Sequence, residues 1–310
     1  MTHILALLGI VIISFSAILV ILADVSPSTA ALFRNLYALP ALLLIRLLLR
    51  GRDARDRRSH WLAFAAGALL AIDLNLWHRS IGLVGAGLAT VLANVQIVFV
   101  GAAAWLMHRE RPSRWAFATV PLVFLGAALI SGLGRPGAYG SDPVLGTLYG
   151  VLAGMMYAAF LILFRASNRQ RAPAIGPLLD ATAGAAVGAL LFGLLDGRLT
   201  FDFGRSAHLW LAVLALLPQV VGWLLIANAL PRLPALETSV LLLMQPTLTI
   251  LWGVLLFAEN LSPLQWSGAA IVIGGVGLLS IKGSVEVSSI PDRQTEILAA
   301  GGAQPEEGSP

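Results

Sequence analysis

Long apolar runs follow one another along the chain up to residue 282 and are separated by short polar connections. A transmembrane helix needs about 20 mainly apolar residues to cross about 30 Å of hydrocarbon. The first run is too long for a signal peptide and no basic stretch precedes it, so we expect it to be retained. The pattern predicts an all-α integral membrane protein with ten transmembrane helices, at approximately residues 4–23, 28–49, 61–81, 86–107, 115–134, 144–164, 174–195, 208–230, 235–257 and 264–282.

Arginines are distributed unevenly between the connections. The connections after the second, fourth and sixth runs each contain three to five arginines, whereas the odd-numbered connections contain none to two. Cytoplasmic loops of membrane proteins carry an excess of Lys and Arg. The bias predicts that both termini face the cytoplasm. The abundance of Arg, Ala, Leu and Gly favours a bacterial chain, and hence a multi-pass protein of the bacterial plasma (inner) membrane.

Composition narrows the class further. Apolar residues make up 58% of the chain and charged residues 12%, with a mean hydropathy of +0.84, whereas soluble domains carry about 25% charged residues. There is no cysteine, which excludes disulfides, zinc–thiolate sites and thiol catalysis. The net charge of +4 comes from arginines in short loops, so we expect no nucleic-acid partner. Residues 284–310, rich in Gly, Ser, Pro and Glu, are expected to form a disordered cytoplasmic tail.

The chain contains an internal repeat. "NVQIVFVGAAAWLMHRE" and "LMQPTLTILWGVLLFAE" align without gaps, and each has a glutamine fourteen residues before its final glutamate, Gln96 before Glu110 and Gln245 before Glu259. We therefore divide the chain into two five-helix repeats, residues 1–136 and 137–283. Because five is odd, the second repeat is inverted in the membrane. Inverted repeats are typical of secondary transporters, whose substrate site lies near the midplane between the halves.

Several stretches resemble the EamA family of the drug/metabolite transporter superfamily over nearly the whole chain to Lys282. They are "FRNLYALPALLL", "LWHRSI" and "QPTLTILWGVLLFAENLSPLQWSGAAIVIGGVGLL". The resemblance implies two five-helix halves and, as the leading expectation, export of amino acids or related metabolites. Ile97 departs from the family pattern, which has a proline there, as Pro246 follows Gln245. The first half is therefore expected to lack a kink at this point.

Polar residues crowd into "AIDLNLWHRSIGL", residues 71–83. On a helix Asp73 and Trp77 share one face, while Asn75 and Arg79 share a roughly opposite one. We expect the Asp73–Trp77 face to line a cavity, with Asp73 as a candidate proton carrier, because an isolated ionised carboxylate in the membrane is costly. The alternative is a neutral or hydrogen-bonded aspartate that holds two helices together. We expect Arg79 and His78 to snorkel to the outer interface.

Two mid-helix prolines, Pro218 and Pro246, stand beside glutamines and tryptophans. A proline frees a carbonyl group four residues earlier, and free carbonyls are tolerated in a membrane where they face protein or a wet cavity. The pattern predicts a binding cavity, the alternative being ordinary helix kinks. Candidate substrate-binding residues are Asp73, Trp77, Asn94, Gln96, Tyr157, Gln219, Trp223, Gln245 and Trp252.

Arg34 and Asp180 are each six residues into their runs. Because the repeats are inverted, they are expected near opposite membrane faces, where they cannot pair. Arg34 is expected to meet Asp24 at the outer rim or to contact an anionic substrate group. Glu110 and Glu259 are expected to mark helix ends rather than to bind ligands.

The sequence favours a carrier over an enzyme. It has no HExxH, GxSxG or P-loop motif, and its histidines are scattered, so we predict no catalytic site, metal or cofactor. The predicted function is alternating-access transport, as export, of a small polar or amphipathic metabolite such as an amino acid. Protons are a candidate coupling ion, and the protein is expected to work as a monomer or homodimer. The alternatives are a flippase for a lipid or lipid-linked intermediate and, less favoured, an intramembrane enzyme.

Overall fold

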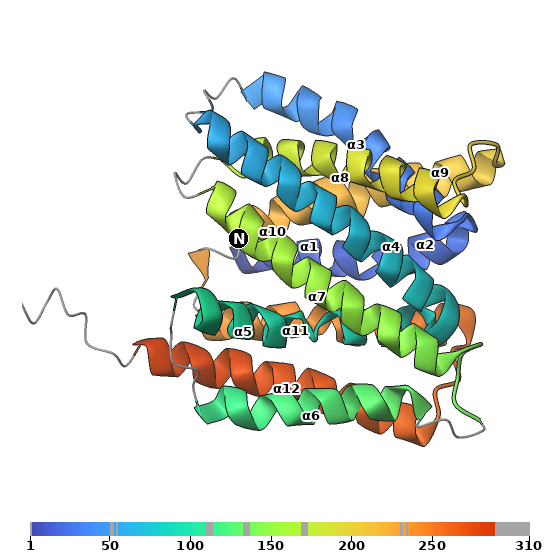
Figure 1. Ribbon diagram of the computed structural model, residues 1–310, viewed down its shortest axis with the longest axis vertical. Coiled ribbons are helices and arrows are strands. Elements are labelled where there is room, and N and C mark those ends of the chain that lie inside the picture. The colour runs from blue at the N-terminus through green and yellow to red at the C-terminus, as the bar shows by residue number, and fades with distance from the viewer. Residues whose placement is uncertain are drawn as a thin grey trace, which may run out of the picture.

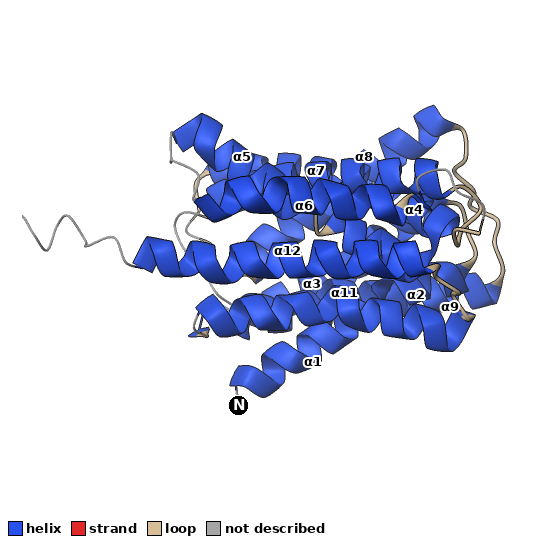
Figure 2. Cartoon of the chain, turned by 90° about the horizontal axis from the view of Figure 1, so that it is seen from below, coloured by secondary structure: helices blue, strands red, loops and turns tan. Residues whose placement is uncertain are grey.

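The computed structural model describes residues 2–49, 53, 55–108, 114–132, 137–168, 173–229, 232–233 and 235–288. Within these ranges the chain is a bundle of helices that lie roughly side by side, with no strand (Figure 2). The elements are α1 Thr2–Ser14, α2 Ser16–Ala23, α3 Pro27–Leu49, α4 Arg57–Ala93, α5 Gln96–His108, α6 Arg114–Ile130, α7 Pro143–Ser167, α8 Ile175–Asp196, α9 Arg205–Leu214, the π-helix η2 Ala215–Gly222, α10 Trp223–Ala229, α11 Ala235–Phe257 and α12 Pro263–Ser288.

The outside of the bundle is apolar. Leu48 of α3 is 70% exposed and Leu195 of α8 is 90% exposed, and many other leucines share this surface. In a membrane such a surface contacts lipid tails rather than water, so its exposure to the surroundings does not destabilise the protein. Six described helical runs are long and apolar enough to cross a membrane, and three shorter apolar helices accompany them. The prediction of an all-α, multi-pass membrane protein is confirmed, while the number ten stays a prediction.

The third and fourth predicted spans form one helical region that turns at Gly85. Gly85 has φ 85° and ψ 168°, which residues with a side chain rarely adopt. Beyond it the chain runs back through α5 toward the other end of the bundle (Figure 1). On this return path Gly150 of α7 packs against Leu92, and Gly154 packs against Ala93.

The helix breaks agree only in part with those predicted from proline: Pro218 falls within the π-helix η2, which lies between α9 and α10. The α4–α5 junction is broken after Ala93, where Thr90 Oγ1 donates to the Ala86 carbonyl at 2.9 Å and Asn94 Nδ2 donates to the Thr90 carbonyl at 2.8 Å. Side chains that bond nearby carbonyls compete with the helix and bend it. The expectation that the first half lacks a kink here was therefore wrong. By contrast, α11 is a single helix through Pro246.

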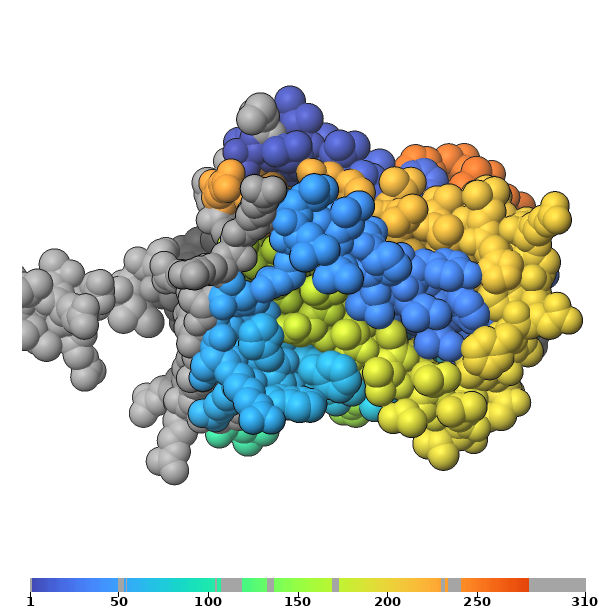
Figure 3. Space-filling view, turned by 90° about the horizontal axis from the view of Figure 1, so that it is seen from above, coloured from blue at the N-terminus to red at the C-terminus, as the bar shows by residue number. Residues whose placement is uncertain are grey.

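Glycines bring α4 and α8 into close contact. A side chain at Gly67 would collide with the Ala181 carbonyl, and one at Gly184 would collide with the Phe64 carbonyl. Small residues of this kind let membrane helices approach closely. Figure 3 shows α8 filling the space between α3 and the beginning of α4 on one face of the molecule.

The beginning of α1 and the end of α12 lie at the same end of the bundle, which we call the terminal end (Figure 1). The connections at residues 24–26, 137–142, 197–204 and 258–262 lie at the opposite end, which we call the distal end. That both termini share one side of the membrane stays a prediction, as does the identity of that side as the cytoplasmic one.

A charged cluster joins α8 and the start of α4 at the terminal end. Arg55 Nη2 lies 2.7 Å from both Asp53 Oδ2 and Asp180 Oδ2, and His60 Nδ1 lies 2.7 Å from Asp180 Oδ2. The hydrogen bond from Arg55 lowers the pKa of Asp53 to about 2. Asp180 therefore pairs with Arg55 and, as expected, not with Arg34.

Candidate functional site

A cavity of about 490 Å³ lies between the two halves of the chain. Its size falls within the range of sites that bind small molecules. The lining comes from α1, α2, α3, α4, α5, α7, η2, α10, α11 and α12. Arg34 and eight of the nine candidate residues line the cavity. The eight are Asp73, Trp77, Asn94, Gln96, Tyr157, Gln219, Trp223 and Gln245.

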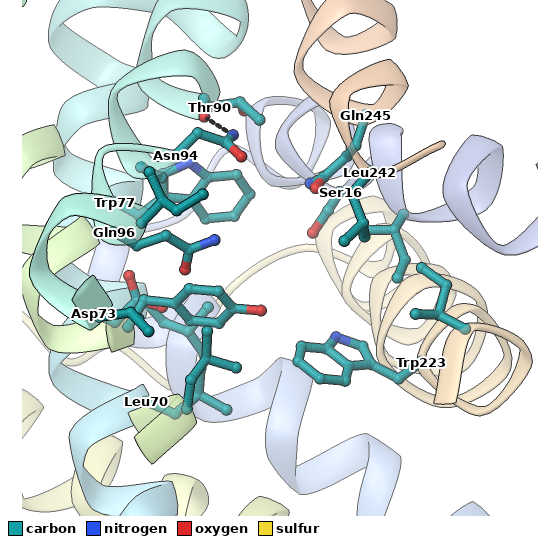
Figure 4. A pocket seen from close by; sticks show the side chains of 18 of the residues that line it. Ser16, Leu70, Asp73, Trp77, Thr90, Asn94, Gln96, Trp223, Leu242 and Gln245 are labelled. Atoms are coloured by element: carbon teal, nitrogen blue, oxygen red, sulfur yellow. Dashed lines mark hydrogen bonds between the residues drawn. The ribbon is translucent and has the colours of Figure 1, made fainter. Parts of the chain in front are cut away.

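Both halves of the chain contribute to the walls of this cavity. Figure 4 shows side chains of α4 and α5 on one side and side chains of α10 and α11 on the other. Asp73 and Trp77 share the first wall, as their spacing predicted, and Trp223 and Gln245 stand across from them. The cavity is therefore lined by both halves of the chain.

Arg34 of α3 is buried beside the cavity, with 4% of its surface exposed. Its Nη2 donates to Gln219 Oε1 at 2.9 Å, and Gln219 Nε2 donates in turn to Asn35 Oδ1 at 3.4 Å. Its Nε and Nη1 have no hydrogen-bond partner. The expected contact of Arg34 with Asp24 is wrong, because η2 brings Gln219 to Arg34 instead.

Asp73 of α4 lines the same cavity and is 6% exposed. Its carboxylate makes no hydrogen bond to any described residue, so it does not join helices in the way that the structural alternative required. The side chains of Asp73 and Arg34 form no ion pair within 4.0 Å, although both line the cavity. The cavity therefore holds a guanidinium group and a carboxyl group that remain separate.

Aromatic and amide groups complete the walls. Tyr157 packs on Phe160 with ring centroids 5.4 Å apart, and Trp223 meets the same Phe160 edge-on at 6.1 Å. The indole Nε1 of Trp77 and the Oε1 of Gln96 are buried without hydrogen-bond partners. The surface offered to a ligand is thus largely apolar, with a few polar groups that remain available.

Trp252 lies outside the cavity lining, contrary to the prediction. Its Nε1 donates to Ser14 Oγ at 2.9 Å, and its ring stacks on Phe15 with centroids 4.7 Å apart. Thr249 Oγ1 also lies 3.1 Å from the Ser14 carbonyl. Trp252 therefore holds α11 against the break between α1 and α2.

The outer polar residues of α4 are paired rather than snorkelling. Arg79 Nη2 lies 2.6 Å from Asp196 Oδ2 of α8, and His78 Nδ1 donates to the Pro27 carbonyl of α3 at 3.1 Å. Helix-to-helix contacts explain both residues, so the expectation of lipid-interface anchors was wrong.

Glu259 is a residue that the sequence reasoning undervalued. It is 3% exposed and accepts hydrogen bonds from the backbone N–H groups of Ala86, at 2.6 Å, and Gly87, at 3.3 Å. Burial raises the pKa of its carboxyl group above the usual value. The repeat signal could have pointed to this role, because the glutamate ends the repeated stretch and Gly85 marks a helix start. Its repeat equivalent, Glu110, lies outside the described residues.

The described residues contain no group of three or more His, Asp and Glu side chains that could hold a metal ion.

Comparison with known proteins identifies the family. The model of the EamA-like transporter family matches residues 1–132 and 144–281. An uncharacterised protein of Pseudomonas aeruginosa is 29% identical over 245 residues, which cover 79% of this chain and 81% of that protein. The uncharacterised transporter YwfM of Bacillus subtilis is 25% identical over 279 residues, covering 89% of this chain and 88% of that protein.

A solved crystal structure shares the fold, with a TM-score of 0.61 at 16% sequence identity, and the match covers 95% of this chain and 98% of the other. The family match spans both halves of the chain, and both halves supply walls of the cavity. The chain is a multi-pass membrane protein that belongs to the EamA-like transporter family.

Proposed function

We propose that the protein is a secondary transporter that moves a small polar or amphipathic metabolite, such as an amino acid, out across the bacterial plasma membrane. The observation that carries this proposal is the cavity between the two repeats, which holds separate Arg34 and Asp73 side chains. Charged side chains inside a membrane protein are costly, and they mark substrate or ion pathways by default. We assign substrate contacts to the eight lining candidates and an anion contact to Arg34.

Ten crossings in two inverted repeats form part of the proposal. The run Arg57–Ala103 serves as two crossings because the chain reverses at Gly85, and the three shorter apolar helices add to the remaining five runs. The contact of α6 with α12, through Gly126 and Gly268, supports this symmetry, because these helices occupy equivalent places at the ends of the two repeats.

We propose that the cavity is closed at the distal end and opens toward the terminal end. Glu259 and Gly87 bring α11 and α4 together at the distal end, where Gly87 packs on Ile250. A methyl group added at Gly101, the repeat equivalent of Ile250, would meet no atom within 4 Å. Because we expect the termini in the cytoplasm, this is an inward-facing state. Alternating access would then close the terminal end of the cavity and open the distal end.

Reconstitution into proteoliposomes tests the function. We expect uptake of a labelled metabolite in exchange for the same internal compound, and an imposed pH gradient should change its rate. Asp73→Asn should remove the response to the gradient, whereas Asp142→Asn should keep it, because Asp142 only caps α7 at the distal end.

Each other outcome corrects a different part of the proposal. An unchanged pH response in Asp73→Asn would show that Asp73 does not carry the proton. Lipid scrambling without solute exchange would replace the proposal with a flippase, and a chemically altered product would indicate an enzyme.

A further inference from the structure

We infer that Glu259 is a proton-binding site that controls the distal closure of the cavity: its carboxylate holds α4 and α11 together, and a proton that arrives from the distal side releases them. The site is separate from the cavity lining, which does not include Glu259. This inference rests on the proposed alternating access and adds what controls the opening of one end.

The carboxylate of Glu259 lies in a cradle that three glycines make. A side chain at Gly85, Gly87 or Gly253 would place its first carbon within 3.2 Å of a carboxylate oxygen of Glu259. Two of these glycines belong to α4 and the third belongs to α11. The absence of side chains on both helices therefore leaves room for one carboxylate at the point where α4 and α11 meet.

The backbone directs Glu259 into this cradle. Ala258, which follows the end of α11, has φ 52°, in the left-handed region that residues with a side chain rarely adopt. The turn brings the N–H group of Glu259 to the Gly253 carbonyl at 3.3 Å. A strained conformation persists only where its surroundings hold it. Here the turn lets the Glu259 carboxylate reach the backbone of α4.

Protonation weakens this contact because the two forms of the carboxyl group bond differently. The carboxylate accepts through both oxygens, from the N–H groups of Ala86 at 2.6 Å and Gly87 at 3.3 Å. A neutral carboxyl group has an O–H in place of one acceptor, and this O–H would face a backbone donor. Hydrogen bonds to an ionised acceptor are also about twice as strong as those to a neutral one. A proton therefore removes one of the two bonds and weakens the other.

The surroundings of Glu259 leave this carboxyl group as the one that responds to mild acid. Its titratable neighbour is Tyr139, whose ring would lie 2.9 Å from a side-chain carbon added at Gly85. Burial and the charge of Glu259 raise the pKa of Tyr139, so this phenol stays neutral. From α12 the neutral Gln265 bonds the backbone of Tyr139, and no described residue forms an ion pair with Glu259 within 4.0 Å. Burial raises the pKa of the Glu259 carboxyl group, which brings its titration closer to neutral pH.

A distance measured across the closure tests the inference without any substrate. The chain has no cysteine, so Gly82→Cys on α4 and Asn260→Cys after α11 provide two exposed sites for nitroxide labels. Pulsed electron paramagnetic resonance on the full-length protein in phosphatidylcholine nanodiscs should show one main distance at pH 8. At pH 5 a population at longer distance should grow several-fold, because protonated Glu259 releases α11 from α4.

Variants in the labelled background assign the response. Glu259→Gln places a neutral group in the cradle, so the longer distance should be populated at both pH values. In Gly253→Ala the methyl group would collide with the carboxylate, so the longer distance should already be populated at pH 8. Asp142→Asn removes a carboxylate that only caps α7 at the same end, and Asp73→Asn removes one from the cavity; both should keep the wild-type response.

The inference is overturned if the wild-type distance does not change between pH 8 and pH 5, or if Glu259→Gln keeps the full wild-type response. It is also overturned if Asp73→Asn abolishes the response, which would assign the proton to the cavity. If Glu259→Gln fails to fold, as judged by thermal unfolding, Gly253→Ala and the wild-type titration still decide.

Failure of this inference differs from failure of the proposed function. A protein whose distance responds to pH but which exchanges no solute in proteoliposomes would keep the proton site and lose the transport proposal. A protein that exchanges solute while the distance ignores pH would keep the transport proposal and lose the proton site.

Discussion

Individual polar side chains in this protein differ in whether another polar group reaches them inside the membrane. Arg79 is neutralised by Asp196 at 2.6 Å, so it serves as a link between α4 and α8. Arg34 is bonded by Gln219 through one nitrogen only, and Asp73 has no hydrogen bond to described residues. A buried charge that lacks a full set of partners is available to a ligand, and this difference separates anchors from site residues.

The charged cluster at the terminal end gives a pH-dependent prediction. The hydrogen bond from Arg55 lowers the pKa of Asp53 in the folded protein to about 2, from 3.8 for a free aspartate side chain. The stabilisation is therefore present above about pH 4 and is lost as the pH falls toward 2. Asp53→Asn should lower the unfolding temperature at pH 7. Below pH 4 the unfolding temperature of this variant should fall less steeply with pH than that of the wild type. Thermal unfolding in detergent between pH 3 and 7 measures this.

Asp202→Asn is the control, because Asp202 is exposed and lies away from the cluster. It should follow the wild-type curve. If the unfolding temperature of Asp53→Asn fell with pH as steeply as that of the wild type, another group would cause the acid sensitivity.

Helices are positioned here by glycines and by side chains that bond the backbone. Gly85 allows the reversal between the two parts of α4, and Glu259 accepts from the first N–H groups that follow it. A carboxylate at a helix N-terminus satisfies free donors and the positive end of the helix dipole. One contact thereby caps the part of α4 that follows Gly85 and joins it to the residues that follow α11.

The α4–α8 contact predicts a contrast between two glycines of the same helix. In Gly67→Ala the new methyl group would collide with the Ala181 carbonyl, so we expect a loss of about 1–3 kcal/mol of unfolding free energy from overpacking. In Gly82→Ala the methyl group would meet nothing within 4 Å, and we expect no loss. Thermal unfolding of both variants measures this, and equal stability would contradict the close packing.

Glu259→Gln should favour opening of the distal end, because the amide replaces one of two acceptor oxygens and removes the charge. The chain has no cysteine, so Thr90→Cys in the cavity lining provides a single reporter thiol. A membrane-impermeant maleimide added to intact cells should label this thiol several-fold faster in Glu259→Gln.

Asp142→Asn in the same reporter background makes a similar charge change at the same end and should leave the labelling rate unchanged, because it caps only α7. If the Thr90→Cys reporter labelled at equal rates alone, with Glu259→Gln and with Asp142→Asn, Glu259 would not contribute to closing the distal end.

The whole molecule combines two halves around a cavity, and the beginning of α1 and the end of α12 lie at the same end of the bundle. Neither repeat has a complete site, since Arg34 and Asp73 come from the first and Gln219 and Trp223 from the second. Movement of one repeat against the other would therefore change the site as well as its access.

Single cysteines test the orientation of the whole molecule. Asp142→Cys and Asp202→Cys at the distal end should react with impermeant maleimide in intact cells. Thr2→Cys and Asp56→Cys at the terminal end should react only after permeabilisation, because we expect that end in the cytoplasm. The reverse pattern would invert the inferred direction of the open cavity, and a mixed pattern would contradict the shared side of the termini.

The sequence by itself determined the membrane class, the family and the face of α4 that lines the cavity. These depend on local properties: run length, composition, and the helical period that places Asp73 and Trp77 together. It also located eight of the nine proposed lining residues, because polar and aromatic residues inside apolar runs are few and conspicuous.

Only the tertiary structure decided which polar groups meet. Arg34 and Gln219 are 185 residues apart, and Ala86 and Glu259 are 173 residues apart. The placement of Trp252 on Ser14 and the closure at Glu259 depend on such distant pairs. Helical periodicity gives the direction in which a side chain points from its own helix. Which helix lies next to that side chain, and how the two helices are shifted along their axes, is set by packing of the whole bundle.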